Sequence, residues 1–222
     1  MTVELPCPLC GSIENVAFFH DARRSYRRCQ RCQLVFVPPA FFLTRAQERA
    51  EYELHQNDLG DAGYRAFLSR LADPMLARLA PGARGLDFGC GPGPALAAMF
   101  REAGLHITLY DSFFYPDEKA LAGSYDFITA SEVVEHLHRP GAELSRLWSL
   151  LRPGGTLGVM TKRVIDADAF SRWHYKNDPT HVCFFSDSTW RWWAQAHQAE
   201  LELIADDVCL LRRSGHAASV QH

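Results

Sequence analysis

The sequence contains little lysine and no long apolar stretch. Only three of its 222 residues are lysines, and the formal net charge is −3. A protein that binds nucleic-acid phosphates normally carries more positive charge, so the composition argues against binding polyanions through bulk charge. No apolar run reaches the length of a membrane-spanning helix, and the first residues do not resemble a secretory signal peptide. With 47% hydrophobic residues, the chain is expected to form one domain with a small appendage.

The number of cysteines does not suit a disulfide-bonded secreted protein. There are seven, and four of them form two Cys-x-x-Cys pairs, which indicates a reducing, cytoplasmic compartment. Each pair can direct two thiolates at one ion, and the spacing between the pairs is typical of zinc ribbons, with a redox disulfide as the alternative. The sequence therefore predicts a structural zinc ribbon over residues 1–39, with zinc bound by Cys7, Cys10, Cys29 and Cys32.

An arginine-rich stretch lies between the cysteine pairs, at residues 23–28. Residues 1–39 hold five arginines against three acidic residues. Such a basic hairpin could contact RNA or another polyanion. A solvated turn is the simpler interpretation.

Residues 40–80 are predicted to form a helical lead-in over a binding site. Apolar residues recur there at helical spacing, and Pro74 after Asp73 predicts the start of a helix. Arg65 could hold a carboxylate through a bidentate pair, or form a surface ion pair. The polar residues of this stretch that could face a ligand are Tyr52, His55, Asn57 and Arg65.

The most informative stretch is residues 85–93, Gly-Leu-Asp-Phe-Gly-Cys-Gly-Pro-Gly. Apolar residues flank Asp87 as in a buried strand, and helix formers begin at Ala95. A strand, a glycine turn and a helix in succession bring backbone N–H groups and a helix N-terminus close to a ligand. No lysine follows the glycines, which argues against a triphosphate-binding P-loop.

The next apolar run ends at Asp111, where a carboxylate can accept hydrogen bonds from a ribose diol. Together with the glycine turn, this resembles the first two motifs of class I S-adenosylmethionine (SAM) methyltransferases of the type 11, 12 and 23 groups. The resemblance implies SAM as cofactor and S-adenosylhomocysteine as product. It implies that the cofactor is held by Asp87, Gly89, Cys90, Gly91, Gly93, Asp111, Ser112, Phe113 and Arg65.

The same resemblance implies a Rossmann-like α/β/α sandwich over residues 81–213, with a mostly parallel sheet of the seven-stranded type. Residues 112–124 are too few for the helix and third strand that such a sheet normally has at this point. We therefore expect this strand to be reduced or missing, which leaves the contact to the adenine amine open. An antiparallel hairpin should close the sheet, and residues 214–222 should form a flexible tail.

Glu132, Glu135 and His136 follow the next predicted strand, at i, i+3 and i+4. If the segment is helical, all three share one face and form half of a divalent-metal site. The pattern resembles the Glu-x-x-Glu-His of small-RNA 2′-O-methyltransferases, where it binds magnesium. It also resembles that of quinone-biosynthesis O-methyltransferases, where it is linked to a divalent ion. In the wider superfamily, however, Glu-His occurs at this place without a metal.

An aromatic and polar segment at residues 173–186 follows the strand that holds the acceptor in class I enzymes. We predict that His174, Tyr175 and Asp178 contact the substrate. Two designs for removing the acceptor's proton stay open. One is a general base, His181 or His136. The other is a divalent ion, magnesium or another, that lowers the acceptor's pKa and is bound by Glu132, Glu135, His136 and His181.

The sequence thus predicts a SAM-dependent methyltransferase that acts on a small-molecule hydroxyl, such as a quinol or phenol. The alternative partner is RNA, bound by the arginine hairpin, because a ribosomal-RNA guanine methyltransferase family also joins a zinc ribbon to a class I domain. A second alternative is a regulatory protein that binds SAM without catalysis. The oligomeric state stays open between monomer and homodimer.

Overall fold

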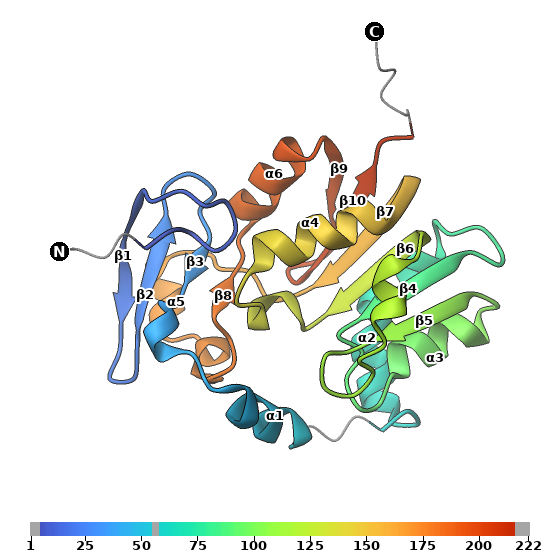
Figure 1. Ribbon diagram of the computed structural model, residues 1–222, viewed down its shortest axis with the longest axis horizontal. Coiled ribbons are helices and arrows are strands. Elements are labelled where there is room, and N and C mark those ends of the chain that lie inside the picture. The colour runs from blue at the N-terminus through green and yellow to red at the C-terminus, as the bar shows by residue number, and fades with distance from the viewer. Residues whose placement is uncertain (1–4, 55–57, 216–222) are drawn as a thin grey trace, which may run out of the picture.

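The computed structural model describes residues 5–54 and 58–215 and shows a small N-terminal unit beside a larger α/β body (Figure 1). Of the polar residues predicted to face a ligand, His55 and Asn57 lie outside the described residues, as does the predicted tail from residue 216 onward. No helix in the described ranges is both long and apolar enough to cross a membrane.

The body is built on one twisted sheet, whose six strands within the described residues follow the order β5-β4-β6-β7-β10-β9. The first four in this order are parallel, and β10 is antiparallel to both of its neighbours. This confirms the mostly parallel sheet and the closing hairpin. The strands are β4 (Arg84–Phe88), β5 (His106–Tyr110), β6 (Tyr125–Ser131), β7 (Leu151–Met160), β9 (Ala199–Leu203) and β10 (Val208–Arg213).

The third strand that class I sheets normally have is absent from the described residues. Between β5 and β6 the chain forms only an isolated bridge, Asp111 to Tyr115, and a 3₁₀ turn, η2 (Glu118–Ala122). Strand β5 is therefore an edge of the sheet. This matches the prediction from the short connecting segment.

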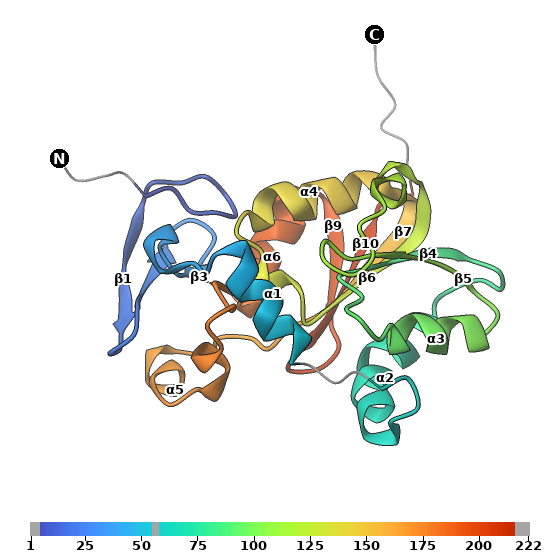
Figure 2. The ribbon, with the colours of Figure 1, turned by 60° about the horizontal axis from the view of Figure 1, so that its bottom comes forward.

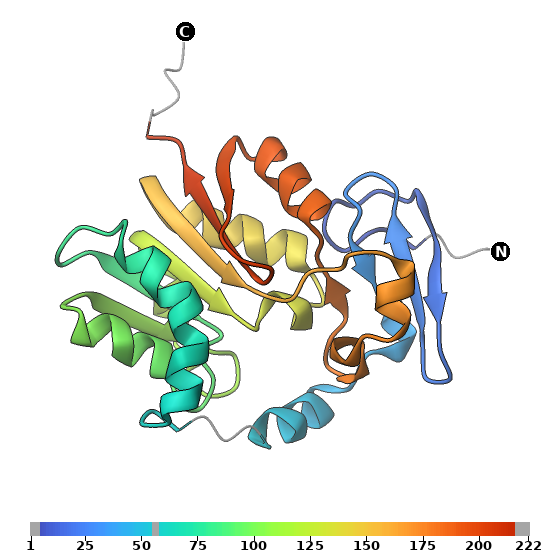
Figure 3. The ribbon, with the colours of Figure 1, turned by 180° about the vertical axis from the view of Figure 1, so that it is seen from behind.

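Helices cover both faces of the sheet. Figure 2 shows α4 (Pro140–Leu150) and α6 (Asp187–Ala196) on one face of the sheet, and α2 (Ala62–Leu76) and α3 (Ala95–Glu102) on the other. In Figure 3, the molecule is turned so that α2 and α3 lie in front of the sheet. The side chain of Ser186 caps α6 by accepting from the Thr189 N–H, which is typical of a serine before a helix. The α/β/α sandwich is thus confirmed.

The predicted helix start at Pro74 is wrong. Helix α2 runs through this proline and ends only at Leu76. Its buried stripe of Leu68, Leu71, Ala72 and Met75 keeps one helical periodicity across residues 73 and 74. Burial of this stripe against the sheet outweighs the local signal of an Asp-Pro pair. The contact is close, because a Cβ on Gly158 of β7 would lie 2.9 Å from the Met75 sulfur.

The N-terminal unit contains a second sheet with the order β1-β2-β3-β8. Strands β1 (Asn15–His20), β2 (Ser25–Cys29) and β3 (Val35–Phe36) come from the predicted ribbon, whereas β8 (Cys183–Phe184) arrives from the C-terminal half. One core cluster joins both units, from Tyr26 of β2 to Leu157 of β7. The remaining elements are α1 (Arg45–Glu53), α5 (Ala167–Ser171) and the 3₁₀ turns η1 (Pro39–Phe41), η3 (Val134–His136) and η4 (His174–Asn177).

Candidate active site

A cavity of about 730 Å³ opens where β4, β5 and β6 end. This volume lies in the range of small-molecule sites, and the carboxyl ends of parallel strands are where α/β proteins bind ligands. Helices α1 and α2 contribute to its wall through Tyr52 and Tyr64. The lining includes Asp87, Gly89, Cys90, Gly91, Asp111, Ser112, Phe113, Glu132, His136, Asp178 and His181 from the sequence prediction.

The glycine turn forms one wall of this cavity. Gly89 and Gly91 have φ of 72° and 63°, a left-handed conformation that favours glycine. A Cβ on Gly89 would lie 2.5 Å from a methyl carbon of Val133, so the turn also packs tightly against the chain after β6. A bulkier residue at either position would strain the backbone. Gly93, predicted to bind cofactor, follows the turn but is not part of the lining.

Asp87 is a carboxylate buried at the bottom of the turn, only 3% exposed. The parallel register of β4 and β6 sets it opposite Thr129, whose hydroxyl donates to Oδ1 at 2.9 Å. Burial nevertheless raises the pKa of Asp87 to about 6. A cationic ligand would stabilise this carboxylate.

Asp111 ends β5 and is tied to the glycine turn. Its Oδ2 accepts from the Gly91 N–H at 3.1 Å, and its Oδ1 accepts from the Phe113 N–H at 2.8 Å. The Phe113 ring is enclosed by α1, with the Arg45 guanidinium 4.7 Å from its centroid and the Tyr52 ring 5.5 Å away. A carboxylate and an aromatic ring thus lie together on the lining, and such a pair can bind a sugar diol and a flat base.

Arg65 does not reach this cavity. It lies on the exposed side of α2, where it forms an ion pair with Glu102 of α3 and donates to the Leu59 carbonyl. Its other predicted role, a surface ion pair, is the one that the structure displays. Cys90 does line the cavity, and burial raises the pKa of its thiol, so the group is neutral at physiological pH.

The segment after β6 is not the helix that the spacing allows. Glu132 takes a left-handed φ of 51°, and only the short 3₁₀ turn η3 follows. The three predicted side chains therefore do not share one helix face. Glu132 is directed at the Tyr175 hydroxyl, 3.2 Å from its Oε2, and its Oε1 is buried with no hydrogen-bond partner in the described part of the chain.

Glu135, His136 and His181 converge instead. One ligand atom from each lies within 4.8 Å of the others. Glu135 is fully buried, and its Oε1 accepts from the Tyr175 hydroxyl. Burial, with the nearby charge of Glu132, raises the pKa of Glu135 to about 8, while burial raises that of Glu132 to about 7. The cluster therefore buries acidic groups that a cation would stabilise.

His181 is oriented by its own loop. The ring Nδ1 lies 2.8 Å from the Tyr175 carbonyl oxygen, which assigns the proton to Nδ1 and makes Nε2 the nitrogen that can accept a proton or ligate a metal. Nε2 is 3.7 Å from Asp178 Oδ2. The His136 and His181 rings are 4.6 Å apart between centroids, in an edge-to-face arrangement.

The three predicted substrate residues have different positions. Only Asp178 lines the cavity. Tyr175 is 6% exposed and lies behind Glu132 and Glu135, where burial raises the pKa of its hydroxyl and makes it a donor to the two carboxylates. His174 is exposed and lies 3.1 Å from Lys162. Neither Tyr175 nor His174 is part of the lining.

Several lining residues were not predicted from the sequence. Glu48 Oε1 of α1 lies 2.8 Å from His138 Nε2, so α1 is in contact with the segment after η3. Arg45 donates to the Ser112 carbonyl at 3.0 Å, next to Phe113. These polar residues lie far in sequence from any motif. Only the pattern of helices over residues 40–80 pointed to a cover at this place.

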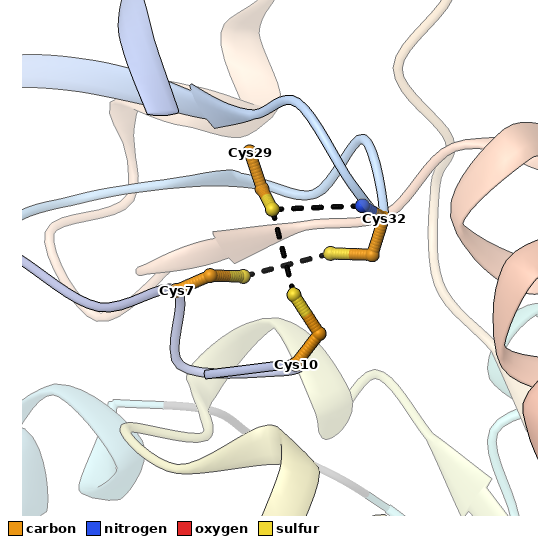
Figure 4. A group of neighbouring side chains, drawn as sticks. All are labelled: Cys7, Cys10, Cys29 and Cys32. Atoms are coloured by element: carbon orange, nitrogen blue, oxygen red, sulfur yellow. Dashed lines mark hydrogen bonds between the residues drawn. The ribbon is translucent and has the colours of Figure 1, made fainter. Parts of the chain in front are cut away.

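The four predicted zinc ligands form a cluster in the N-terminal unit. Figure 4 shows their sulfurs pointing to a common centre, and all four lie within 4.8 Å of one another. Each Cys-x-x-Cys pair ends in a left-handed residue, Gly11 or Gln33, whose N–H bonds back to the first cysteine's carbonyl. A hydrogen bond from Cys32 lowers the pKa of Cys7 to about 6. Four convergent thiols, one of them with a lowered pKa, are a donor set that could hold a structural zinc ion.

Comparison with known proteins agrees with this geometry. A family model described as "Methyltransferase domain" matches residues 61–204, more than half of the chain. The ubiquinone biosynthesis O-methyltransferase of Xanthomonas campestris pv. campestris is 35% identical over 114 residues, which cover 40% of this chain and 47% of that protein. The match therefore spans about half the length of this curated relative.

Two solved structures share the fold. One is the 1,6-didemethyltoxoflavin-N1-methyltransferase of Burkholderia thailandensis, with its substrate and S-adenosylhomocysteine bound, at TM-score 0.51 and 17% identity over 90% of this chain and 99% of that chain. The other is the magnesium protoporphyrin IX methyltransferase of Synechocystis PCC 6803 with bound S-adenosylhomocysteine, at TM-score 0.51 and 15% identity over 79% and 97%. At these identities the likeness concerns the fold alone. From the extent of the family match, we conclude that the chain belongs to the methyltransferase-domain family.

Proposed function

We propose that this protein transfers the methyl group of SAM to a hydroxyl oxygen of a small molecule, of the quinol or phenol class. The family match supports methyl transfer, and the partial match to a ubiquinone biosynthesis O-methyltransferase supports the acceptor class. The observation that carries the proposal is the position of His136 and His181, which line the same cavity as the glycine turn. In this proposal, the groups that bind the methyl donor and the groups that remove the proton line one cavity.

The cofactor end consists of Asp87, Asp111, Phe113 and the glycine turn. SAM supplies a methyl group on a sulfonium, so the chain need only hold donor and acceptor in line and help to remove a proton. Asp87, whose pKa is raised by burial, would accept the cationic end of the cofactor. Asp111 would accept from the ribose hydroxyls, and the Phe113 ring would pack on the adenine.

At the acceptor end we propose a divalent cation held by Glu135, His136 and His181. The residues fit such an ion, because Glu135 Oε2 is buried without a hydrogen-bond partner in the described residues and its pKa is raised. Two imidazoles and one carboxylate favour manganese, zinc or iron over magnesium, which prefers oxygen ligands. The ion would supply Lewis acidity that lowers the acceptor's pKa. Without an ion, His181 Nε2 would act as the general base.

The cysteine cluster would hold one structural zinc ion. Its four thiolates leave no open position for chemistry. We propose a cytoplasmic location, as predicted from the cysteine content, because thiols stay reduced in that compartment.

The proposal is tested with SAM that carries a ¹³C-methyl group and with catechol and hydroquinone as acceptors, in the presence of Mn²⁺, Mg²⁺ or a chelator. We expect a methoxy resonance in the product spectrum, stronger with Mn²⁺ than with Mg²⁺. Glu135→Gln should remove the stimulation by metal. The matched control is Glu143→Gln, another glutamate of the cavity wall that pairs with Arg146 and does not belong to the cluster.

Each outcome separates the alternatives. Full turnover in chelator, with loss of turnover in His181→Gln, would replace the metal with a simple base. Methyl transfer to nitrogen or carbon probes but to no hydroxyl would contradict O-methylation. Failure of the wild-type protein to bind S-adenosylhomocysteine in calorimetry would contradict the cofactor assignment itself.

The structure does not favour RNA as the acceptor. The RNA alternative depends on the arginine hairpin, yet Arg24 is 5% exposed and Arg23 is bonded to Asn177. Arg27 is engaged with Asn15. Arg24 and Arg27 are therefore not free to bind phosphates, whereas Arg23, Arg28 and Arg31 are exposed.

A further inference from the structure

Arg24 is a buried cation whose bonds run from the N-terminal unit to the loop that carries the active-site histidine. Its Nη2 donates to the carbonyls of Lys176 and Asp178 at 2.6 and 2.8 Å, and its Nη1 donates to that of Pro179 at 3.1 Å. Its Nε donates to the Tyr26 hydroxyl at 3.0 Å. One guanidinium thus binds three carbonyl oxygens at the end of η4.

This arrangement is specific to arginine. The C-terminal carbonyls of a helical turn carry partial negative charge that a cation neutralises. A guanidinium offers a rigid fork of donors that can reach several oxygens at once, whereas a lysine ammonium is a point charge on a flexible stem. Removal of the side chain would take a donor from the buried Lys176 carbonyl and from the part-buried carbonyl bonds of Asp178 and Pro179, which is costly for a buried group.

The carbonyls that Arg24 holds belong to the tight turn that positions His181. The His181 N–H donates to the Asp178 carbonyl at 3.3 Å, and the His181 Nδ1 lies 2.8 Å from the Tyr175 carbonyl. The turn is completed by the Thr180 N–H, which donates to Asp178 Oδ1 at 2.8 Å. Freedom at residues 176–179 would therefore move the imidazole.

A second connection lies immediately after His181. The Val182 N–H donates to the Glu135 carbonyl at 2.8 Å, and the Val182 carbonyl accepts from the Val37 N–H at 2.9 Å. Strand β8 then pairs with β3 of the N-terminal unit. Glu135 and His181 are therefore joined to each other and to the cysteine-bearing unit by backbone bonds on one side and by Arg24 on the other.

We infer that the N-terminal cysteine unit is a positioning element of the active site, and that Arg24 is the positioning residue that sets the acceptor half without affecting the cofactor half. On this inference, the cysteine cluster does more than stabilise the N-terminal unit. The cluster fixes the position of β2, and β2 begins directly after Arg24. In the activity, Mn²⁺ and S-adenosylhomocysteine arms of its test the inference rests on the proposed function, and in the hydrogen–deuterium exchange arm it does not.

The test compares the wild type with Arg24→Met, Arg24→Lys and Arg28→Met, all in the full chain. Arg28 is the matched control, because it is an exposed arginine of β2, the strand that follows Arg24, and its guanidinium lies 5.4 Å from the Phe18 ring centroid. Hydrogen–deuterium exchange is followed on residues 174–184. Mn²⁺ affinity is measured by electron paramagnetic resonance, S-adenosylhomocysteine affinity by calorimetry, and KM and kcat with catechol.

For Arg24→Met we expect amide exchange of Thr180, His181 and Val182 to rise at least tenfold, Mn²⁺ affinity to fall about tenfold and KM for catechol to rise. Affinity for S-adenosylhomocysteine should stay within twofold of the wild type. Arg24→Lys should give exchange rates and affinities between those of the wild type and those of Arg24→Met, since lysine keeps the charge but not the forked set of donors. Arg28→Met should match the wild type, and removal of zinc from the cysteines should reproduce the Arg24→Met pattern.

Two results would overturn the inference. In one, the exchange of the loop and the Mn²⁺ affinity of Arg24→Met are those of the wild type. In the other, exchange rises throughout the chain and S-adenosylhomocysteine affinity falls in parallel, which describes a general loss of stability. If Arg24→Met does not fold, Arg24→Lys is judged by the same two criteria. Absence of methyl transfer by the wild type would contradict the proposed function and leave the exchange result to decide the inference.

Discussion

The proposed cofactor half and the proposed acceptor half of the cavity are built in different ways. The cofactor half comes from one continuous stretch, residues 84–113, in which a strand, a turn, a helix and a second strand follow one another. The acceptor half combines η3, the loop after η4 and an arginine from the N-terminal unit. Local sequence dictates the first half, whereas the second exists only when distant segments have come together.

The two halves share one physical feature. Each buries an acidic group whose pKa is raised by desolvation, about 6 for Asp87 and about 8 for Glu135. Such groups destabilise the empty protein and are stabilised by a bound cation. The halves should therefore respond to different ligands, and substitutions should affect one half at a time.

The largest effect, on zinc content and on the free energy of unfolding, is expected from a substitution in the cysteine cluster of the N-terminal unit. Cys29→Ser removes a fully buried thiol of the cluster and should release one equivalent of zinc, because three thiolates hold the ion poorly. The free energy of unfolding should fall by several kcal/mol, since metal binding contributes folding free energy. Elemental analysis and thermal unfolding measure both. Cys209→Ser, a buried thiol of β10 outside the cluster, should keep its zinc; no zinc in the wild type would contradict the assignment.

The next effect concerns the acceptor half alone. His181→Ala should lower kcat by about 10²- to 10⁴-fold, the usual contribution of a group that removes a proton. Affinity for S-adenosylhomocysteine should not change. His174→Ala in the same loop is the control, because its side chain is exposed and outside the cavity lining. Equal losses in both variants would show that the loop, and not the His181 imidazole, matters.

A complementary change breaks the cofactor half alone. Gly91→Val places a β-branched residue at φ 63° on the cavity wall. We expect S-adenosylhomocysteine to bind at least 100-fold more weakly, about 2.7 kcal/mol. Gly82→Val is the control, since Gly82 also has a left-handed φ of 72°, a Cβ there would meet no atom within 4 Å, and the residue does not line the cavity. Calorimetry that finds unchanged affinity in Gly91→Val would contradict the placement of the cofactor.

The smallest expected effect is a pH dependence of cofactor binding. Between pH 5 and pH 7 Asp87 loses its proton, with a pKa of about 6, and only the carboxylate attracts a cation. S-adenosylhomocysteine should therefore bind about tenfold more tightly at pH 7 than at pH 5. In the ligand-free protein the sign is opposite: the contribution of Asp87 to stability falls as pH rises from about 4 to about 6, because the unfolded chain releases this proton first. Asp87→Asn should bind weakly and show no such dependence on pH.

The difference between the halves also explains what the sequence could and could not predict. The glycine turn, Asp111 and the cysteine pairs were predictable because each is a short pattern with a single geometric meaning. The missing third strand followed from counting residues 112–124. Patterns of this kind are complete within a few residues.

The acceptor half was predicted in its residues but not in its arrangement. Glutamate carries no signal for a left-handed conformation, so the φ of 51° at Glu132 could not be foreseen. The burial of Tyr175 and the bonds of Arg24 depend on β8 joining the N-terminal sheet, a pairing between segments about 150 residues apart. From sequence alone, an arginine in a basic hairpin is expected to be exposed. The burial of Arg24 follows only from its contact with the loop at residues 176–179.

The central claim, methyl transfer from SAM to a small-molecule hydroxyl, is tested most directly with SAM labelled on its methyl group. The protein is incubated with a pooled small-metabolite extract in one reaction and with total RNA in another, each with and without Mn²⁺. We predict label in the small-molecule fraction, increased by the metal and absent from Gly91→Val. Label in RNA alone, or none in either reaction, would contradict the claim.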